Sequence, residues 1–220
     1  MTVEPTPMFP LGSVLLPGML LPLHVFEDRY RRLVEAVLDL DEPEFGVTLI
    51  ERGSEVGGGD IRAMVGCVAR VLEAGRTDDG RWALVTVGTR PIRVLEWLPD
   101  DPFPRARTSA LDDDPTLPPD AADRVGSLAV QVRRCLALAS ELGSSGPVDV
   151  ELSEDVWLAT YQAAVLAPLG SLDRQRVLGT TSATERLVVV EELVAEQHEL
   201  LEARLRLGDP GGDDDAWNAD

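Results

Sequence analysis

Residues 8–34 place the strongest limit on how this chain can fold. Pro10, Pro17 and Pro22 interrupt its apolar residues, and because proline breaks the hydrogen-bond pattern of a helix, the first half cannot be one continuous helix. From Phe26 onward, apolar residues recur at helical spacing instead. The segment therefore predicts a strand, a proline–glycine turn, a second strand and then an amphipathic helix.

Two acidic residues begin the expected helix. Glu27 and Asp28 lie in its first turn, where the helix dipole favours negative charge. Each can reach an arginine four residues on, Arg31 or Arg32, and such a pair stabilises a helix by about 0.3 kcal/mol. The apolar side chains expected to face the core are Phe26, Tyr30, Leu33, Val34 and Val37.

This ordered run resembles the opening of the Lon protease N-terminal domain family. The family pattern is Phe-Pro-Leu, a Leu-x-Pro-Gly turn, Pro-Leu, and Phe-Glu-x-Arg-Tyr at the start of a helix. The residues that carry the resemblance here are Phe9, Pro10, Leu11, Leu16, Pro17, Gly18, Pro22, Leu23, Phe26, Glu27, Arg29 and Tyr30, with Gly88 and Arg90 later in the chain. We interpret them as fold-forming residues, so the motif indicates a family without locating an active site.

Several short strands with turns between them are expected in the next part of the chain. The expected strands cover residues 45–50, 62–74, 81–87, 92–98 and 105–111. Gly66 predicts a bulge or a tight bend, and Pro91 predicts an edge or a bulge because proline lacks a ladder donor. Residues 53–60 are expected to form a flexible connection. The resemblance implies a PUA-like curved sheet or barrel with one packed helix.

Beyond Asp112–Pro119 the sequence pattern becomes helical. Four helices with short links predict a bundle, with Asp120 and Ser153 as helix caps. The expected class is therefore α+β, with a PUA-like β domain over 6–113, a helical bundle over 119–207 and a disordered acidic tail over 208–220.

Charge and composition exclude several classes of function. The 20 basic residues face 39 acidic ones, for a net charge of −19, so the chain should repel DNA and anionic membranes. It contains no lysine, hence neither a phosphate-binding Gly-x-x-x-x-Gly-Lys loop nor the base of a serine–lysine peptidase. The resemblance thus implies a free-standing member without the ATPase and peptidase modules. With no signal peptide or membrane-spanning run visible, we expect a cytoplasmic protein.

Other catalytic or metal-binding arrangements are also missing from the sequence. His24 and His198 fall in different expected domains, and Cys67 and Cys135 are expected to be buried thiols. No His-Glu-x-x-His or Gly-x-Ser-x-Gly motif occurs. We therefore expect a protein without catalytic residues, cofactor or bound metal.

The resemblance implies that the chain binds unfolded or tagged protein segments, or one specific protein partner, as an adaptor or regulator of protein quality control. Such binding needs an exposed apolar patch, or an edge strand that accepts an extended peptide. The candidate binding residues are Met19, Leu20, Leu21, Trp97 and Phe103. The oligomeric state stays open.

RNA binding is the alternative, because PUA-like folds in other proteins bind RNA. Residues 62–108 contain eight arginines and six acidic residues, which makes this stretch mildly basic within an acidic chain. A dedicated RNA-binding protein has a stronger basic patch, so the sequence favours protein recognition over RNA recognition.

Overall fold

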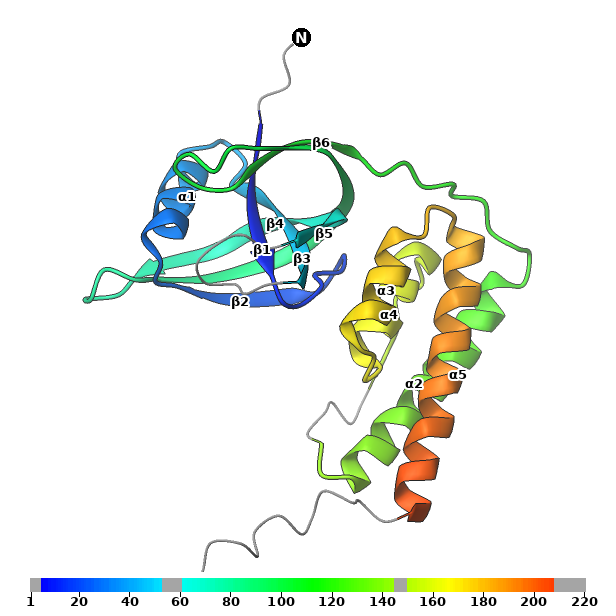
Figure 1. Cartoon of the computed structure of the whole chain (residues 1–220). Helices are drawn as coiled ribbons and strands as arrows, with labels where there is room; N and C mark the ends of the chain where they lie inside the picture. The colour runs from blue at the N-terminus through cyan, green and yellow to red at the C-terminus, as the bar shows by residue number, and fades with distance from the viewer. Residues whose placement is uncertain (1–4, 53–60, 145–149, 208–220) are drawn as a thin grey trace, which may run out of the picture. The chain divides into compact units, whose positions relative to one another are not determined.

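The computed structural model describes residues 5–52, 61–144 and 150–207. The connection expected at 53–60 and the tail expected at 208–220 lie outside these residues. The chain divides into two compact units (Figure 1). The first contains the residues up to Asp114 together with Ser171–Ser182, and the second contains Pro115–Gly170 and the residues from Ala183 onward.

One mixed sheet of six strands forms the first unit. The strands are β1 (Thr6–Leu11), β2 (Leu20–Val25), β3 (Glu44–Arg52), β4 (Ile61–Arg76), β5 (Trp82–Leu98) and β6 (Arg105–Ala110). Their order is β2-β5-β4-β3-β1-β6, and β6 pairs with β5 as well. Five strands therefore close on themselves, while β2 pairs with β5 alone within the described residues. The closed β structure confirms the expected fold class.

Strand β5 is longer than expected and serves two neighbours. Its first part, 82–87, pairs with β2, and its second part, 92–98, pairs with β6. The separate strands expected at 81–87 and 92–98 are therefore wrong, because the chain continues through a register shift instead of turning. Pro91 lies at this irregularity, opposite Cys67, as its missing N–H predicts.

Two glycines allow strands or loops to approach unusually closely. A Cβ atom on Gly66 would lie 2.3 Å from the Val47 carbonyl oxygen, and a register shift in β3 lies beside this position. A Cβ atom on Gly88 would lie 2.2 Å from the Leu16 carbonyl oxygen. The motif residue Gly88 therefore holds the proline–glycine turn against β5.

Helix α1 (Asp28–Leu38) starts two residues later than its apolar pattern suggests. Phe26 precedes it and is exposed, so its expected place in the buried stripe is wrong. Glu27 is the N-cap residue and pairs with Arg29 at 3.1 Å, and Asp28 pairs with Arg31 at 2.6 Å. The expected pairs at four-residue spacing therefore do not form.

The core of the first unit joins the helix and the barrel. The Tyr30 ring of α1 stacks on Phe9 of β1, with 4.1 Å between ring centroids, and the Phe45 ring lies 5.9 Å from the Phe9 ring. A second group of buried side chains lies among β1, β4, β5 and β6; its members are Met8, Val68, Ile92, Val94 and Ala106. The opening motif thus supplies core residues.

The second unit contains three packed helices, α2 (Ala121–Glu141), α3 (Val156–Leu166) and α5 (Ala183–Leu207). Asp155 caps α3 by accepting a hydrogen bond from the Trp157 N–H, so the cap expected at Ser153 is wrong. Arg186 is fully buried and donates from Nε to Thr160 Oγ1 at 3.1 Å.

The short helix α4 (Ser171–Gly179) belongs to the first unit, although its neighbours in sequence belong to the second. Its Gln175 side chain donates to the Val65 carbonyl of β4 at 3.0 Å. The compact β unit therefore includes a segment from the helical half of the sequence.

Candidate functional site

The expected binding residues divide into exposed and buried groups. Leu20 is 60% exposed and Met19 is half-buried, but Leu21 and Phe103 are buried in the core. Successive side chains of a strand point to opposite faces, so Leu20 and Leu21 cannot both face solvent on β2. Leu21 and Phe103 therefore do not belong to an exposed patch.

Trp97 lies apart from Leu20 on the long strand β5. Leu20 pairs with Val87, whereas Trp97 is ten residues further along β5 and pairs with Ala106 of β6. The indole is partly buried against the barrel core, and the Arg62 guanidinium lies 4.7 Å from its ring centroid. The structure thus does not combine Trp97 with Leu20 in one surface.

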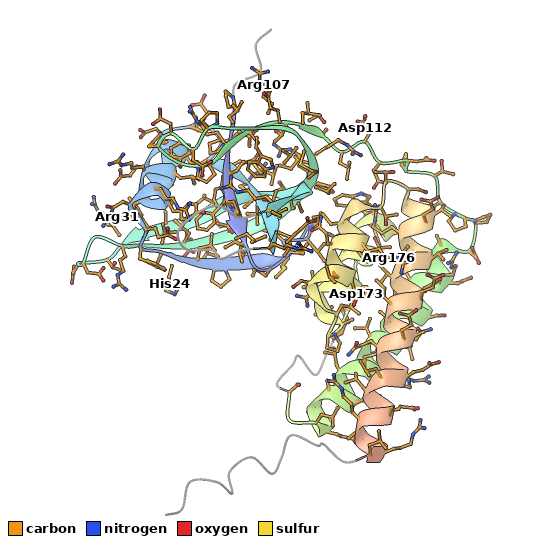
Figure 2. The ribbon with its side chains drawn as sticks, viewed as in Figure 1. His24, Arg31, Arg107, Asp112, Asp173 and Arg176 are labelled. Carbon is orange, nitrogen blue, oxygen red and sulfur yellow. The ribbon has the colours of Figure 1, made fainter. Side chains whose placement is uncertain are left out.

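A different set of side chains surrounds Leu20. The outward positions of β2 are Leu20, Pro22 and His24, and the same two-residue alternation continues to Phe26, which is 55% exposed. Figure 2 shows His24 projecting from β2 away from the barrel. We call these four residues the β2 face. The strand alternation extended past Val25 identifies Phe26 as outward, whereas its helical spacing predicts a place in the helix stripe.

A hollow of about 140 Å³ lies between β1 and β2. Its walls are mainly apolar, with contributions from the start of α1; the lining residues are Phe9, Pro10, Leu11, Leu23, His24, Val25, Phe26, Glu27 and Tyr30. Consecutive residues of β2 line the hollow, although their side chains point to opposite faces of the sheet. The hollow therefore lies at the edge of this strand. We call it the β1–β2 hollow.

A second hollow, of about 410 Å³, shares His24 and Phe26 with the first and reaches the turn between β4 and β5. Asp79 in this turn accepts a hydrogen bond from the Thr77 hydroxyl and pairs with Arg81 at 2.9 Å. The hydrogen bond from Thr77, and then that from the Arg81 N–H, lower the pKa of Asp79. This hollow therefore has an ionised carboxylate in its wall at neutral pH. We call it the turn hollow.

Most arginines of the barrel lie beside carboxylates. Glu44 pairs with both Arg70 at 2.8 Å and Arg90 at 2.7 Å. Three further arginines of this stretch, Arg62, Arg81 and Arg107, pair with Asp100, Asp79 and Glu96. Five of the eight arginines in residues 62–108 thus pair with four carboxylates, and the basic patch that RNA binding needs is weakened further.

The candidate nucleophiles are unsuited to catalysis. Burial raises the pKa of the Cys67 thiol to about 12 and that of Cys135 to about 11, so both stay protonated at neutral pH. His24 belongs to the first unit and His198 to the second. Among the described residues, no three His, Cys, Asp or Glu side chains gather as a metal site would need. In the same residues, no helix has the length and hydropathy to cross a membrane.

Comparison with known proteins gives a consistent match over nearly the whole chain. A Lon protease from Heliobacterium modesticaldum is 24% identical over 94% of this chain, and one from Anaeromyxobacter dehalogenans is 29% identical over 89%. These matches cover only 26% and 23% of the two proteases. The chain thus spans about a quarter of the length of these curated relatives.

Solved structures agree with this match. The crystal structure of a Lon N-terminal domain protein from Xanthomonas campestris is 29% identical, with a TM-score of 0.62 over 88% of this chain and 98% of that one. The N-terminal domain of a Lon protease from the Mycobacterium avium complex shares the fold, with a TM-score of 0.64 at 17% identity. The family model of the ATP-dependent protease La (LON) substrate-binding domain matches residues 5–196. This chain therefore belongs to the LON substrate-binding domain family.

Proposed function

We propose that this chain is a non-catalytic module that binds unfolded or tagged protein segments through the β2 face. The observation that carries the proposal is the row of outward residues from Leu20 to Phe26, with large apolar side chains at both ends and a hollow beside it. Exposed apolar groups that adjoin a concave site are typical of interaction surfaces. Half-buried Met19 adds an adaptable side chain next to this row.

The role of adaptor or regulator in protein quality control is part of the same proposal. The family description, a substrate-binding domain of an ATP-dependent protease, supports it. The chain itself has no lysine, so it lacks both the phosphate-loop lysine and the base of a serine–lysine dyad. ATP hydrolysis or peptide cleavage by the purified chain would contradict the non-catalytic assignment.

The first experiment measures binding to an unfolded protein. Fluorescently labelled, reduced and carboxymethylated lysozyme is titrated with this chain, and fluorescence anisotropy is recorded at about 50 and 200 mM salt. We expect binding that weakens less than about tenfold between these salt concentrations, because apolar contacts are not screened and only the contacts to Asp78 and Asp79 are. Leu20→Ser and Phe26→Ser should each weaken it about tenfold, the effect of losing one buried apolar side chain.

Leu95→Ser is the matched control. Leu95 is 59% exposed and also lies on a strand, but on the second part of β5, outside the β2 face. The Leu95→Ser variant should bind the labelled protein as tightly as the unchanged chain does. Equal weakening by Leu95→Ser and Leu20→Ser would contradict the assigned surface, and absence of binding would contradict capture of unfolded segments.

A labelled single-stranded RNA in the same titration tests the alternative function. RNA binding through arginines would weaken steeply between about 50 and 200 mM salt, because each phosphate contact releases counterions. Since most of the barrel arginines already pair with carboxylates, we expect no RNA binding at either salt concentration.

A further inference from the structure

Strand β2 has a main-chain edge that no other described strand occupies. The Gly88 N–H donates to the Met19 carbonyl at 2.9 Å, and by the alternation of an antiparallel ladder Pro22, which pairs with Val85, takes a position where the main chain does not bond to β5. The Leu21 carbonyl, one residue earlier, points towards β5, because it accepts a hydrogen bond from the Thr86 hydroxyl at 2.9 Å.

The main-chain groups of the outward residues therefore point away from β5. By the alternation of an antiparallel ladder, Leu20 and His24 share the orientation of Pro22. Their N–H groups and the carbonyls of all three residues line the open edge. Carbonyl acceptors repeat every second residue along this edge and N–H donors flank Pro22, an arrangement that matches the main chain of an extended polypeptide except at the proline. The open edge thus favours a partner whose main chain is extended and whose N–H and C=O groups are free to bond.

The β1–β2 hollow lies beside this edge and has room for one side chain. Its volume of about 140 Å³ and its apolar lining suit a leucine or an aromatic ring. In an extended partner, side chains on the same face repeat about every 7 Å, so one anchor can enter the hollow while its main chain follows β2.

The turn hollow adds a charge preference. Asp78 and Asp79 both line it, against one arginine, Arg81, which pairs with Asp79. The wall therefore keeps a negative excess, in a chain of net charge −19. A basic side chain on the partner complements this end of the β2 face.

We infer that β2 accepts an extended polypeptide segment as an added strand, with one apolar side chain in the β1–β2 hollow and a basic side chain facing Asp78 and Asp79. The inference rests on the proposed function and makes it specific, since main-chain pairing selects segments that are locally extended. A second copy of the chain, paired edge to edge through β2, is an outcome that the test distinguishes.

Peptides with altered main chains provide the test. Overlapping peptides from the lysozyme sequence are screened against the full chain by anisotropy, and the tightest binder is resynthesised with N-methyl groups at alternate residues. An added strand turns every second N–H towards β2. Methylation in one phase should therefore weaken binding about tenfold or more, and methylation in the other phase should leave it unchanged.

Hydrogen exchange of the full chain with the same peptide locates the pairing. The amides of Leu20 and His24 should exchange fast in the free chain and slow on binding, whereas those of Leu21 and Leu23, directed at β5, should stay protected throughout. Protection gained elsewhere, with Leu20 and His24 unchanged, would overturn the assignment to β2.

Two substitutions at one position complete the test. His24→Pro removes an outward N–H without removing a bond to β5, while His24→Ala removes the imidazole and keeps the N–H. We expect weakened peptide binding for the proline variant alone. If the His24→Pro variant does not fold, the methylated peptides still test whether the partner adds to β2 as a strand.

The outcomes separate the two proposals. If both methylated peptides bind equally and Leu20→Ser weakens the binding, strand addition is wrong. Binding through apolar contacts, the proposed function, would still hold. Binding of neither the peptides nor the unfolded protein would overturn both. A dimer that dissociates in His24→Pro, with no peptide bound, would show that a second copy occupies the edge and would overturn the peptide proposal.

Discussion

Glu44 shows how one residue of the barrel depends on its neighbours. Its side chain is only 10% exposed and contacts Arg70 and the motif residue Arg90. Burial by itself raises the pKa of this carboxyl, but the hydrogen bonds from Arg90 and Arg70 outweigh it and hold the pKa below 4.5. The ionised form is therefore favoured in the folded state, and Arg90 serves the fold by bridging β5 to β3.

This pairing predicts a pH-dependent loss of stability in Glu44→Gln. A carboxyl whose pKa is lowered by folding stabilises the fold above its unfolded pKa, near 4.5, and this contribution disappears as the pH falls through the folded pKa. Urea unfolding should show a loss of about 1 kcal/mol at pH 7. The difference from the unchanged chain should shrink as the pH falls below 4.5.

Glu96→Gln is the control for this measurement. Glu96 pairs with Arg107 at 3.1 Å, but both side chains are more than half exposed, and such surface pairs contribute less than about 0.5 kcal/mol. If Glu44→Gln lowers the free energy of unfolding equally at pH 7 and in acid, the arginine pairing is not the cause.

At the scale of elements, the packing of β4 against β3 depends on Gly66. An added Cβ at this position would lie 2.3 Å from the Val47 carbonyl, so the main chain must move to admit it. We expect Gly66→Ala to lower the free energy of urea unfolding by about 2 kcal/mol.

Gly75 lies in the same strand and offers a matched control. An added Cβ there would meet no atom within 4 Å, so Gly75→Ala should leave stability unchanged or raise it slightly. Equal unfolding midpoints for the two variants would contradict the close approach of β3 and β4.

Local patterns predicted the elements better than their ends. Apolar runs and turn residues indicated the strands, and the glycine at 66 and the proline at 91 marked the irregularities. The turn expected between the strands at 81–87 and 92–98 was wrong, because Gly88 there allows close packing and does not reverse the chain. Ser153 was a plausible cap, but Asp155 accepts the hydrogen bond from the Trp157 N–H in the first turn of α3 instead. The role of Gly88 depends on a contact with Leu16, far away in the sequence, which local patterns do not show.

The candidate site was harder to predict because it combines distant segments. Strand alternation alone separates Leu20 from Leu21 and extends to Phe26, so the β2 face could be inferred from the sequence. The β1–β2 hollow could not, since it needs the pairing of β1 with β3 and of β2 with β5. Trp97 and Leu20 were both candidates for one apolar patch, yet Trp97 lies in the part of β5 that pairs with β6 and not with β2.

At the scale of the whole molecule, the order of the chain and the grouping of its elements differ. The β half of the sequence, expected over 6–113, forms a compact unit that also includes Ser171–Ser182. Gln175 of this segment binds the Val65 carbonyl, and the Asp114 N–H donates to the Thr181 carbonyl at 2.9 Å. The chain thus leaves the unit for α2 and α3, returns to it for α4, and leaves it again for α5.

This grouping predicts that a fragment of residues 1–114 is not a complete folding unit. Without α4 it loses the hydrogen bond from Gln175 and the packing of α4 on β4, so it should unfold at a lower urea concentration than the β unit of the full chain. A peptide of residues 171–182 should raise the midpoint of the fragment, and a scrambled peptide should not. Tryptophan fluorescence reports the change, because Trp82 and Trp97 lie within the fragment. A fragment as stable as the β unit of the full chain would show that β1–β6 and α1 suffice, and α4 would then be an addition to a barrel that is already complete.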